Sequence, residues 1–76
     1  MAVVNKMTKL TLHRDSHHSE VKDCTYSIVQ ADDGRKFLQI DTYGSAQRKM
    51  PDKKSQSIRF SPEAVEQLRR ILAEEL

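Results

Sequence analysis

The sequence predicts an α+β domain, with a four-stranded antiparallel sheet and one C-terminal helix packed on one face (ββββα). Short segments in which polar and apolar residues alternate, as they do in half-buried strands, occupy much of the chain before residue 61. An Asp-Asp-Gly sequence at positions 32–34 is typical of a hairpin turn, and Ser-Pro-Glu at positions 61–63 is typical of the start of a helix. All 76 residues are expected to form this single domain.

Two strands are expected before the hairpin turn. The first covers residues 9–13, where Leu10 and Leu12 alternate with polar residues and share one face. The second covers residues 20–31, where β-branched and aromatic residues favour a strand. Residues 1–6 have no clear periodicity, so they are either disordered or an extra piece of strand.

Two further strands are expected after the hairpin turn, in which Gly34 tolerates the positive φ that a tight turn requires. Residues 35–43 alternate again, and residues 55–60 form the last strand. The connector at residues 45–54 contains Pro51, which lacks the N–H that a central strand needs. We therefore expect a loop there.

The helix is expected from Pro62 to the end of the chain. Ser61 is its N-cap, Pro62 stands where a missing N–H costs nothing, and Glu63 faces the positive end of the helix dipole. Apolar residues recur at helical spacing and form a stripe that must cover a sheet face. The stripe consists of Ala64, Val65, Leu68, Ile71, Leu72 and Leu76, and the face that it is expected to cover consists of Leu10, Leu12, Tyr26, Ile28, Leu38, Ile40, Ile58 and Phe60.

Composition limits the classes of protein to which the chain can belong. A domain of 76 residues buries only about 60% of its unfolded surface, so its stability is marginal and homodimerisation is an obvious remedy. The sequence has neither an apolar run long enough to cross a membrane nor a leader at Met1, so we expect a soluble cytoplasmic protein with no membrane partner. The single cysteine, Cys24, cannot form an internal disulfide, and in a strand it is expected to be a small buried side chain.

No residue pattern supports catalysis. Neither a glycine-rich phosphate loop nor a catalytic pair or triad occurs in a recognisable context, so we expect no enzymatic activity and no cofactor. Residues of metal-ligand type gather around one polar turn but lack the spacing of a zinc site, so we expect no bound metal. These residues are His13, Asp15, His17, His18, Glu20, Asp23 and Cys24.

Positive charge is concentrated between positions 46 and 60, although the net charge of the chain is only +2. One acidic residue, Asp52, stands there against five basic ones, which are Arg48, Lys49, Lys53, Lys54 and Arg59. A local basic segment on a nearly neutral protein is typical of proteins that bind a polyanion. The alternative is a solvated loop whose lysines maintain solubility.

Two aromatic residues, Phe37 and Tyr43, are expected on the sheet face that the helix leaves uncovered. The rest of this face is polar and consists of Lys9, Thr11, His13, Thr25, Ser27, Gln39, Asp41, Ser57 and Arg59. Proteins that hold single-stranded nucleic acids combine basic grooves with aromatic rings on which the bases stack. The two rings can therefore bind bases; alternatively, they pack against a second subunit or a loop.

The second half of the chain combines a strand, a basic loop with a proline, another strand, Ser-Pro-Glu and an amphipathic helix. In this order it resembles the positive-cofactor-four family of transcriptional coactivators and their small bacterial relatives. The resemblance implies a ββββα fold, a homodimer to whose interface the helix contributes, and binding of single-stranded DNA through Tyr43, Lys53, Lys54 and Arg59. The loop here is shorter and contains no tryptophan. The residues that carry the resemblance are 37–41, 50–51, 53–54, 57–63 and 67–68.

These patterns together lead to one functional hypothesis. We expect a homodimer that binds single-stranded DNA or RNA, with DNA favoured, and that depends little on base sequence. The alternative is a protein-interaction module whose open face and edge strands pair with another chain. The residues expected to bind nucleic acid are Phe37, Tyr43, Arg48, Lys49, Lys53, Lys54 and Arg59.

Overall fold

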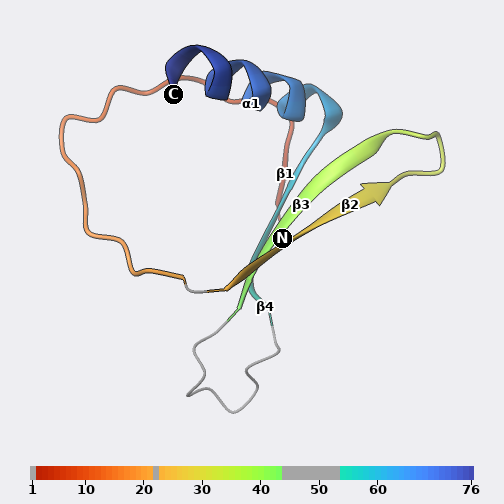
Figure 1. Cartoon of the computed structure of the whole chain (residues 1–76), viewed down its shortest axis with the longest axis horizontal. Coiled ribbons are helices and arrows are strands. Elements are labelled where there is room, and N and C mark those ends of the chain that lie inside the picture. The colour runs from red at the N-terminus through yellow and green to blue at the C-terminus, as the bar shows by residue number, and fades with distance from the viewer. Residues whose placement is uncertain (1, 22, 44–53) are drawn as a thin grey trace.

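The computed structural model describes residues 2–21, 23–43 and 54–76. The strands form one sheet in the order β1-β4-β3-β2, and α1 follows β4 (Figure 1). The predicted α+β domain with ββββα order is confirmed. Its elements are β1 (Ala2–Val4), β2 (Cys24–Gln30), β3 (Lys36–Tyr43), β4 (Lys54–Phe60) and α1 (Pro62–Glu75).

The sheet is mixed, so the prediction of a purely antiparallel sheet is wrong for one pair of strands. β3 is antiparallel to both β2 and β4, but β1 is parallel to β4, with Val4 opposite Phe60. Parallel neighbours need a long connection, and here β2 and β3 lie within it. The Ser61 N–H donates to the Val4 carbonyl at 2.9 Å, so this pairing continues to the start of α1.

The first strand does not lie at residues 9–13, where the sequence predicted it. Residues 5–21, which we call the arm, contain no strand (Figure 1). Leu10 and Leu12 are 76% and 70% exposed, so they do not contribute to the core. The alternation of polar and apolar residues here is therefore not matched by burial of one face.

The beginning of the arm is held by α1 instead of by a neighbouring strand. The Gln67 side-chain amide accepts a hydrogen bond from the Met7 N–H at 2.8 Å and donates one to the Met7 carbonyl at 2.6 Å. Further along, Lys9 Nζ lies 2.7 Å from Glu75 Oε1, and this contact raises the pKa of Lys9. A helix side chain thus satisfies backbone groups that a sheet would otherwise pair.

The hairpin turn predicted between the second and third strands is confirmed. The Gly34 N–H donates to the Ala31 carbonyl at 2.9 Å, and the Ala31 N–H donates to the Arg35 carbonyl at 2.8 Å. Gly34 has φ +90°, a conformation that glycine adopts without steric cost. Asp33 accepts from the Arg35 N–H at 3.1 Å and from Arg35 Nε at 2.8 Å, which fixes the turn.

Acid is expected to remove the contribution of Asp33 to stability. Hydrogen bonding, first of all from the Arg35 backbone N–H, lowers the pKa of Asp33 from its ordinary value of 3.8. A carboxylate whose pKa is depressed in the folded state stabilises the fold above its unfolded pKa, and this stability is lost as the pH falls through the folded pKa. The urea midpoint of wild type should therefore exceed that of Asp33→Asn near neutral pH, and the two should start to converge near pH 4 and meet as the pH falls through the lowered pKa of Asp33. Asp32→Asn is the control, and a difference that is independent of pH would contradict this assignment.

The start of α1 is as predicted. Ser61 Oγ accepts a hydrogen bond from the Ala64 N–H at 3.2 Å, and Pro62 stands in the first turn. The pKa of Glu63 is lowered, first by its own backbone N–H and then by the Ser61 hydroxyl. The local sequence thus satisfies the N–H groups that open the helix.

Loss of the N-cap has a measurable expected effect. Ser61→Ala removes the hydroxyl that accepts from Ala64 and should lower the free energy of unfolding by about 1 kcal/mol, measured by urea denaturation. The control is Ser19→Ala in the exposed arm, which should change it little. Equal losses in both variants would be inconsistent with the capping role.

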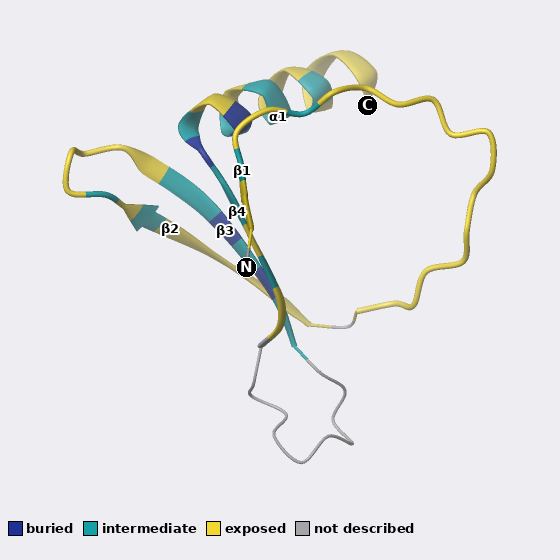
Figure 2. Cartoon of the chain, turned by 180° about the vertical axis from the view of Figure 1, so that it is seen from behind, coloured by how far each residue is buried: buried dark blue, intermediate teal, exposed yellow. Residues whose placement is uncertain are grey.

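The core is smaller than the sequence predicted. Among the described residues, Ala64 is the one apolar side chain that is fully buried, while Leu38, Ile40 and Phe60 are half-buried. Tyr26 and Ile28, which were expected beneath the helix, are 75% and 60% exposed. α1 contacts β3 and β4, whereas β2 is the edge strand further away (Figure 2).

Cys24, at the start of β2, is exposed and not buried as predicted, because β2 is the edge strand that α1 leaves uncovered. The radius of gyration is 14.9 Å, compared with about 11 Å for a compact domain of this length, because the β2–β3 hairpin and the arm extend away from α1 (Figure 1). Within the described residues, no helix combines the length and hydropathy that crossing a membrane requires.

Candidate nucleic-acid interface

The register of the sheet places Phe37, Tyr43 and Arg59 on the same face. Alternate residues of β3 project to the same side, and Arg59 is paired with Gln39 of that set. Tyr43 belongs to this side as well, because its hydroxyl lies 2.9 Å from Thr25 Oγ1. We call this side the open face; its residues are Val3, Thr25, Ser27, Val29, Phe37, Gln39, Asp41, Tyr43, Ser57 and Arg59.

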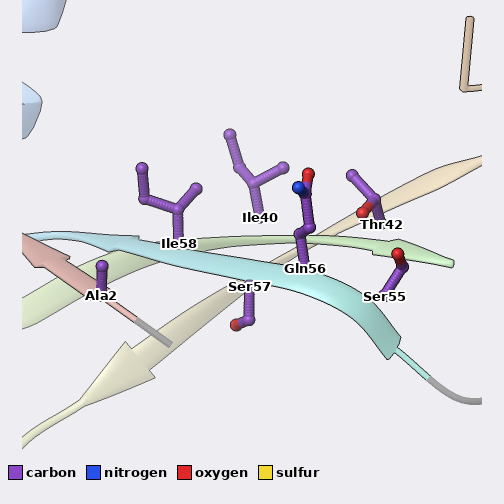
Figure 3. A pocket seen from close by; sticks show the side chains of 7 residues that line it. All are labelled: Ala2, Ile40, Thr42, Ser55, Gln56, Ser57 and Ile58. Atoms are coloured by element: carbon purple, nitrogen blue, oxygen red, sulfur yellow. The ribbon is translucent and has the colours of Figure 1, made fainter. Parts of the chain in front are cut away.

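The open face lies opposite α1. Figure 3 shows Ile40 and Ile58 projecting to the side of the sheet on which part of α1 is visible, while Ser57 projects to the other side. Successive residues of a strand alternate between the two faces, so this view assigns the neighbouring residues as well. The expectation that the two aromatic residues and Arg59 share a face away from the helix is confirmed by the register.

A polar relay crosses the centre of the open face. Arg59 donates to Gln39 Oε1 through Nε at 3.0 Å and also through Nη2. The Gln39 Nε2 group donates in turn to both carboxylate oxygens of Asp41, at 3.0 and 3.2 Å. Gln39 therefore separates a positive and a negative side chain and satisfies both.

The relay explains why a carboxylate is tolerated on this face. Asp41 and Gln39 are only 2% and 6% exposed, and both belong to β3, which lies between β2 and β4. The Asp41 charge is therefore not presented directly to solvent, whereas the Arg59 side chain is half-buried and reaches the surface. The carboxylate fixes Gln39, and Gln39 fixes two of the five N–H donors of the guanidinium group.

A second basic residue lies beside the aromatic residues, and sequence reasoning missed it. The guanidinium carbon of Arg35 lies 5.4 Å from the centre of the Phe37 ring, within the range of a cation–π contact. Arg35 is also paired with Asp33 at 2.8 Å, so the turn orients it. The signal was available, because residues two apart in an extended chain lie on the same side.

Tyr43 lies at an irregular position of the sheet. The register shifts between Thr42 and Tyr43, and Tyr43 is paired with Lys54. Its half-buried ring is held at the hydroxyl end by the Thr25 side chain of the neighbouring strand. A bulge commonly re-aims a side chain, and this one lies at the end of the open face where the connector begins.

Of the basic residues in the connector, Lys54 is the one whose backbone lies in the described part of the chain. Arg48, Lys49 and Lys53 lie outside the described residues. The backbone of Lys54 begins β4 beside Tyr43, so the connector rejoins the sheet at the Tyr43 end of the open face. Lys9, Thr11 and His13, which were expected on this face, belong to the arm and are not part of the sheet.

Among the described residues, no three His, Cys, Asp or Glu side chains are grouped so that they could hold a metal ion. His18 Nδ1 lies 3.2 Å from the carbonyl of His17, which is a local contact within the arm.

A shallow depression of about 500 Å³ lies on the opposite face of the sheet, where α1 does not extend (Figure 3). Its lining combines apolar side chains such as Ile40 and Ile58 with small polar ones such as Thr42. None of the described residues predicted to bind nucleic acid lines it. Ser57 is the one residue of the open face that also borders the depression, and its side chain projects away from it, so the two features lie on opposite faces of the sheet.

Comparison of the chain with protein-family models, curated proteins and solved structures gave no match.

Proposed function

We propose that this protein binds single-stranded nucleic acid, with DNA favoured over RNA and little dependence on base sequence, and that it acts as a homodimer. The observation that carries the proposal is the placement of Phe37, Tyr43 and Arg59 on one face of the sheet, opposite α1. The resemblance to the positive-cofactor-four family, carried by residues 37–41, 50–51, 53–54, 57–63 and 67–68, gives additional support. It also points to a coactivator-like role.

The chemistry of the open face suits a ligand that offers alternating bases and phosphates. Aromatic rings stack on bases of any identity, so Phe37 and Tyr43 provide affinity without sequence preference. The Arg59 guanidinium, oriented by Gln39, is suited to a phosphate because it presents fixed donors as well as charge. Arg35 adds a second guanidinium group next to the Phe37 ring.

Direct titration tests the proposal. A fluorescently labelled oligothymidylate is titrated with the protein at several salt concentrations, alongside a duplex of the same length. We expect tighter binding of the single strand and a linear fall of log affinity with log salt, with a slope of about −0.7 for each neutralised phosphate. No binding at low salt, or affinity that does not respond to salt, would exclude the proposal. If a pull-down recovers a stoichiometric protein partner and no nucleic acid, the protein is instead a protein-interaction module.

Arg59 is expected to be one of the phosphate contacts. Arg59→Ala should weaken binding of the oligothymidylate by about tenfold or more, since a hydrogen bond to a charged group contributes roughly 1.5–3 kcal/mol. It should also reduce the steepness of the salt dependence by about 0.7. The matched control is Arg70→Ala on the exposed surface of α1, which removes the same charge away from the open face. If both variants lose affinity equally, net charge and not the open face determines binding.

A further inference from the structure

β2 is an edge strand, and among the described residues no other strand pairs with its outer side. β2 lies at one end of the sheet and pairs, in the described part of the chain, with β3 alone. Proteins usually protect such edges with charged residues, proline, a bulge or a very short strand. β1, at the other edge, has three residues, but β2 has seven, with no charge, no proline and no register shift against β3.

The apolar side chains of this strand also lack cover. Tyr26 and Ile28 project on the α1 side of the sheet but remain 75% and 60% exposed. With Ala64 as the one fully buried apolar side chain among the described residues, the chain has little core to offset its conformational entropy. Burial of further apolar surface is what a domain of this size needs to be stable.

The sequence of β2 is complementary to itself. When two copies are placed antiparallel about a two-fold axis through Ser27, all seven residues of one strand face all seven of the other. Tyr26 then faces Ile28 of the second copy, and this aromatic and β-branched combination is a favourable cross-strand pair. Thr25 faces Val29 of the second copy, and because no residue of the strand is charged, no like charges meet.

We propose that the homodimer forms by antiparallel pairing of β2 with β2 of a second copy, in the register centred on Ser27. The two sheets join into one continuous sheet of eight strands, and the free backbone groups of both edges become paired. The two-fold axis is perpendicular to the sheet, so the two open faces lie on the same side. This inference rests on the homodimer of the proposed function but not on nucleic-acid binding, and it places the interface at β2 instead of at the helix to which the resemblance points.

A designed disulfide tests the register. Cys24 and Gln30 of the second copy are opposite each other in the proposed pairing, at a Cα separation of about 4.5–5.5 Å that suits a disulfide. Within one copy the same two positions are about 20 Å apart along the strand, too far for an internal bond. Gln30→Cys, oxidised with oxidised glutathione in the absence of nucleic acid, should therefore become a covalent dimer on a non-reducing gel. Wild type and Glu66→Cys, whose introduced thiol lies on the exposed side of α1, should remain uncrosslinked.

Charge substitutions test the same pairing without oxidation. In the proposed register, position 26 of each copy faces position 28 of the other. Tyr26→Lys combined with Ile28→Lys therefore places two pairs of lysines opposite each other, so this variant should sediment as a monomer. Tyr26→Lys combined with Ile28→Glu sets opposite charges together and should sediment as a dimer. Both positions are exposed in the single chain, so circular dichroism should show that both variants fold.

The outcomes separate this inference from the proposed function. The β2 pairing is supported if Gln30→Cys crosslinks and if Tyr26→Lys combined with Ile28→Glu sediments as a dimer. This holds even if the protein does not bind the oligothymidylate. Absence of the Gln30→Cys crosslink, or two charge variants with the same sedimentation coefficient as wild type, would overturn the β2 pairing. A dimer that crosslinks through Glu66→Cys instead would place the interface on α1.

Discussion

Replacing both Phe37 and Tyr43 by leucine is expected to abolish most of the affinity for single-stranded DNA. Each base stacked on an aromatic ring contributes roughly 1–3 kcal/mol, so loss of both rings should weaken binding at least about 30-fold. Leucine keeps the apolar bulk at these half-buried positions while removing the flat ring. The measurement is the anisotropy of a labelled oligothymidylate at fixed salt.

Two controls separate stacking from folding. Tyr43→Phe keeps the ring and removes only the hydroxyl that lies 2.9 Å from Thr25 Oγ1, so it should retain most of the affinity. Arg35→Ala removes the guanidinium group that lies over Phe37 and should have an intermediate effect. If the double leucine variant binds as tightly as wild type while remaining folded, the rings do not contact the ligand.

Replacing Gln39 by alanine should cause the largest loss of stability in the sheet. The substitution removes the amide that donates to the buried Asp41 carboxylate and accepts from Arg59. Breaking hydrogen bonds to buried charged groups costs about 2–3 kcal/mol, which for a domain of this size lowers Tm by roughly 10–20 °C. Thermal unfolding followed by circular dichroism measures the shift.

The matched control for Gln39 is another glutamine of the same sheet. Gln56→Ala, at an exposed position of β4 on the α1 side of the sheet, should change Tm only slightly. A loss for Gln56→Ala comparable to that for Gln39→Ala would show that the glutamine side chain matters generally in this sheet. In that case the relay would have no special role.

The parts of the fold that were predicted correctly are those whose signals are local. The Asp-Asp-Gly turn and the Ser61 cap depend on residues within a few positions of each other, and both form as expected. The strand expected at residues 9–13 was wrong because alternation does not reveal whether a partner strand is available. The backbone is instead held just before this segment, where the Gln67 side chain bonds Met7, and a contact over this distance along the chain leaves no pattern in the sequence.

The same reasoning applies to the candidate site. Alternation along β3 and β4 was enough to predict that Phe37, Tyr43 and Arg59 share a face, and the register confirms it. The sequence could not show that Asp41 is buried, because burial depends on which parts of the chain, distant in sequence, pack around a residue. The structure shows instead that Gln39 bonds both Asp41 and Arg59, so the carboxylate positions the Arg59 guanidinium group indirectly.

The measurement that tests the central claim most directly is an NMR titration with unlabelled oligothymidylate. In two-dimensional spectra of the ¹⁵N-labelled protein, the amides of Phe37, Gln39 and Tyr43 and the Nε–H of Arg59 are expected to shift together and to saturate at one concentration. The exposed surface of α1 should remain unchanged. If the shifts are confined to α1 and to the depression around Ile40 and Ile58, and the signals of the open face do not move, the result would contradict binding at the open face.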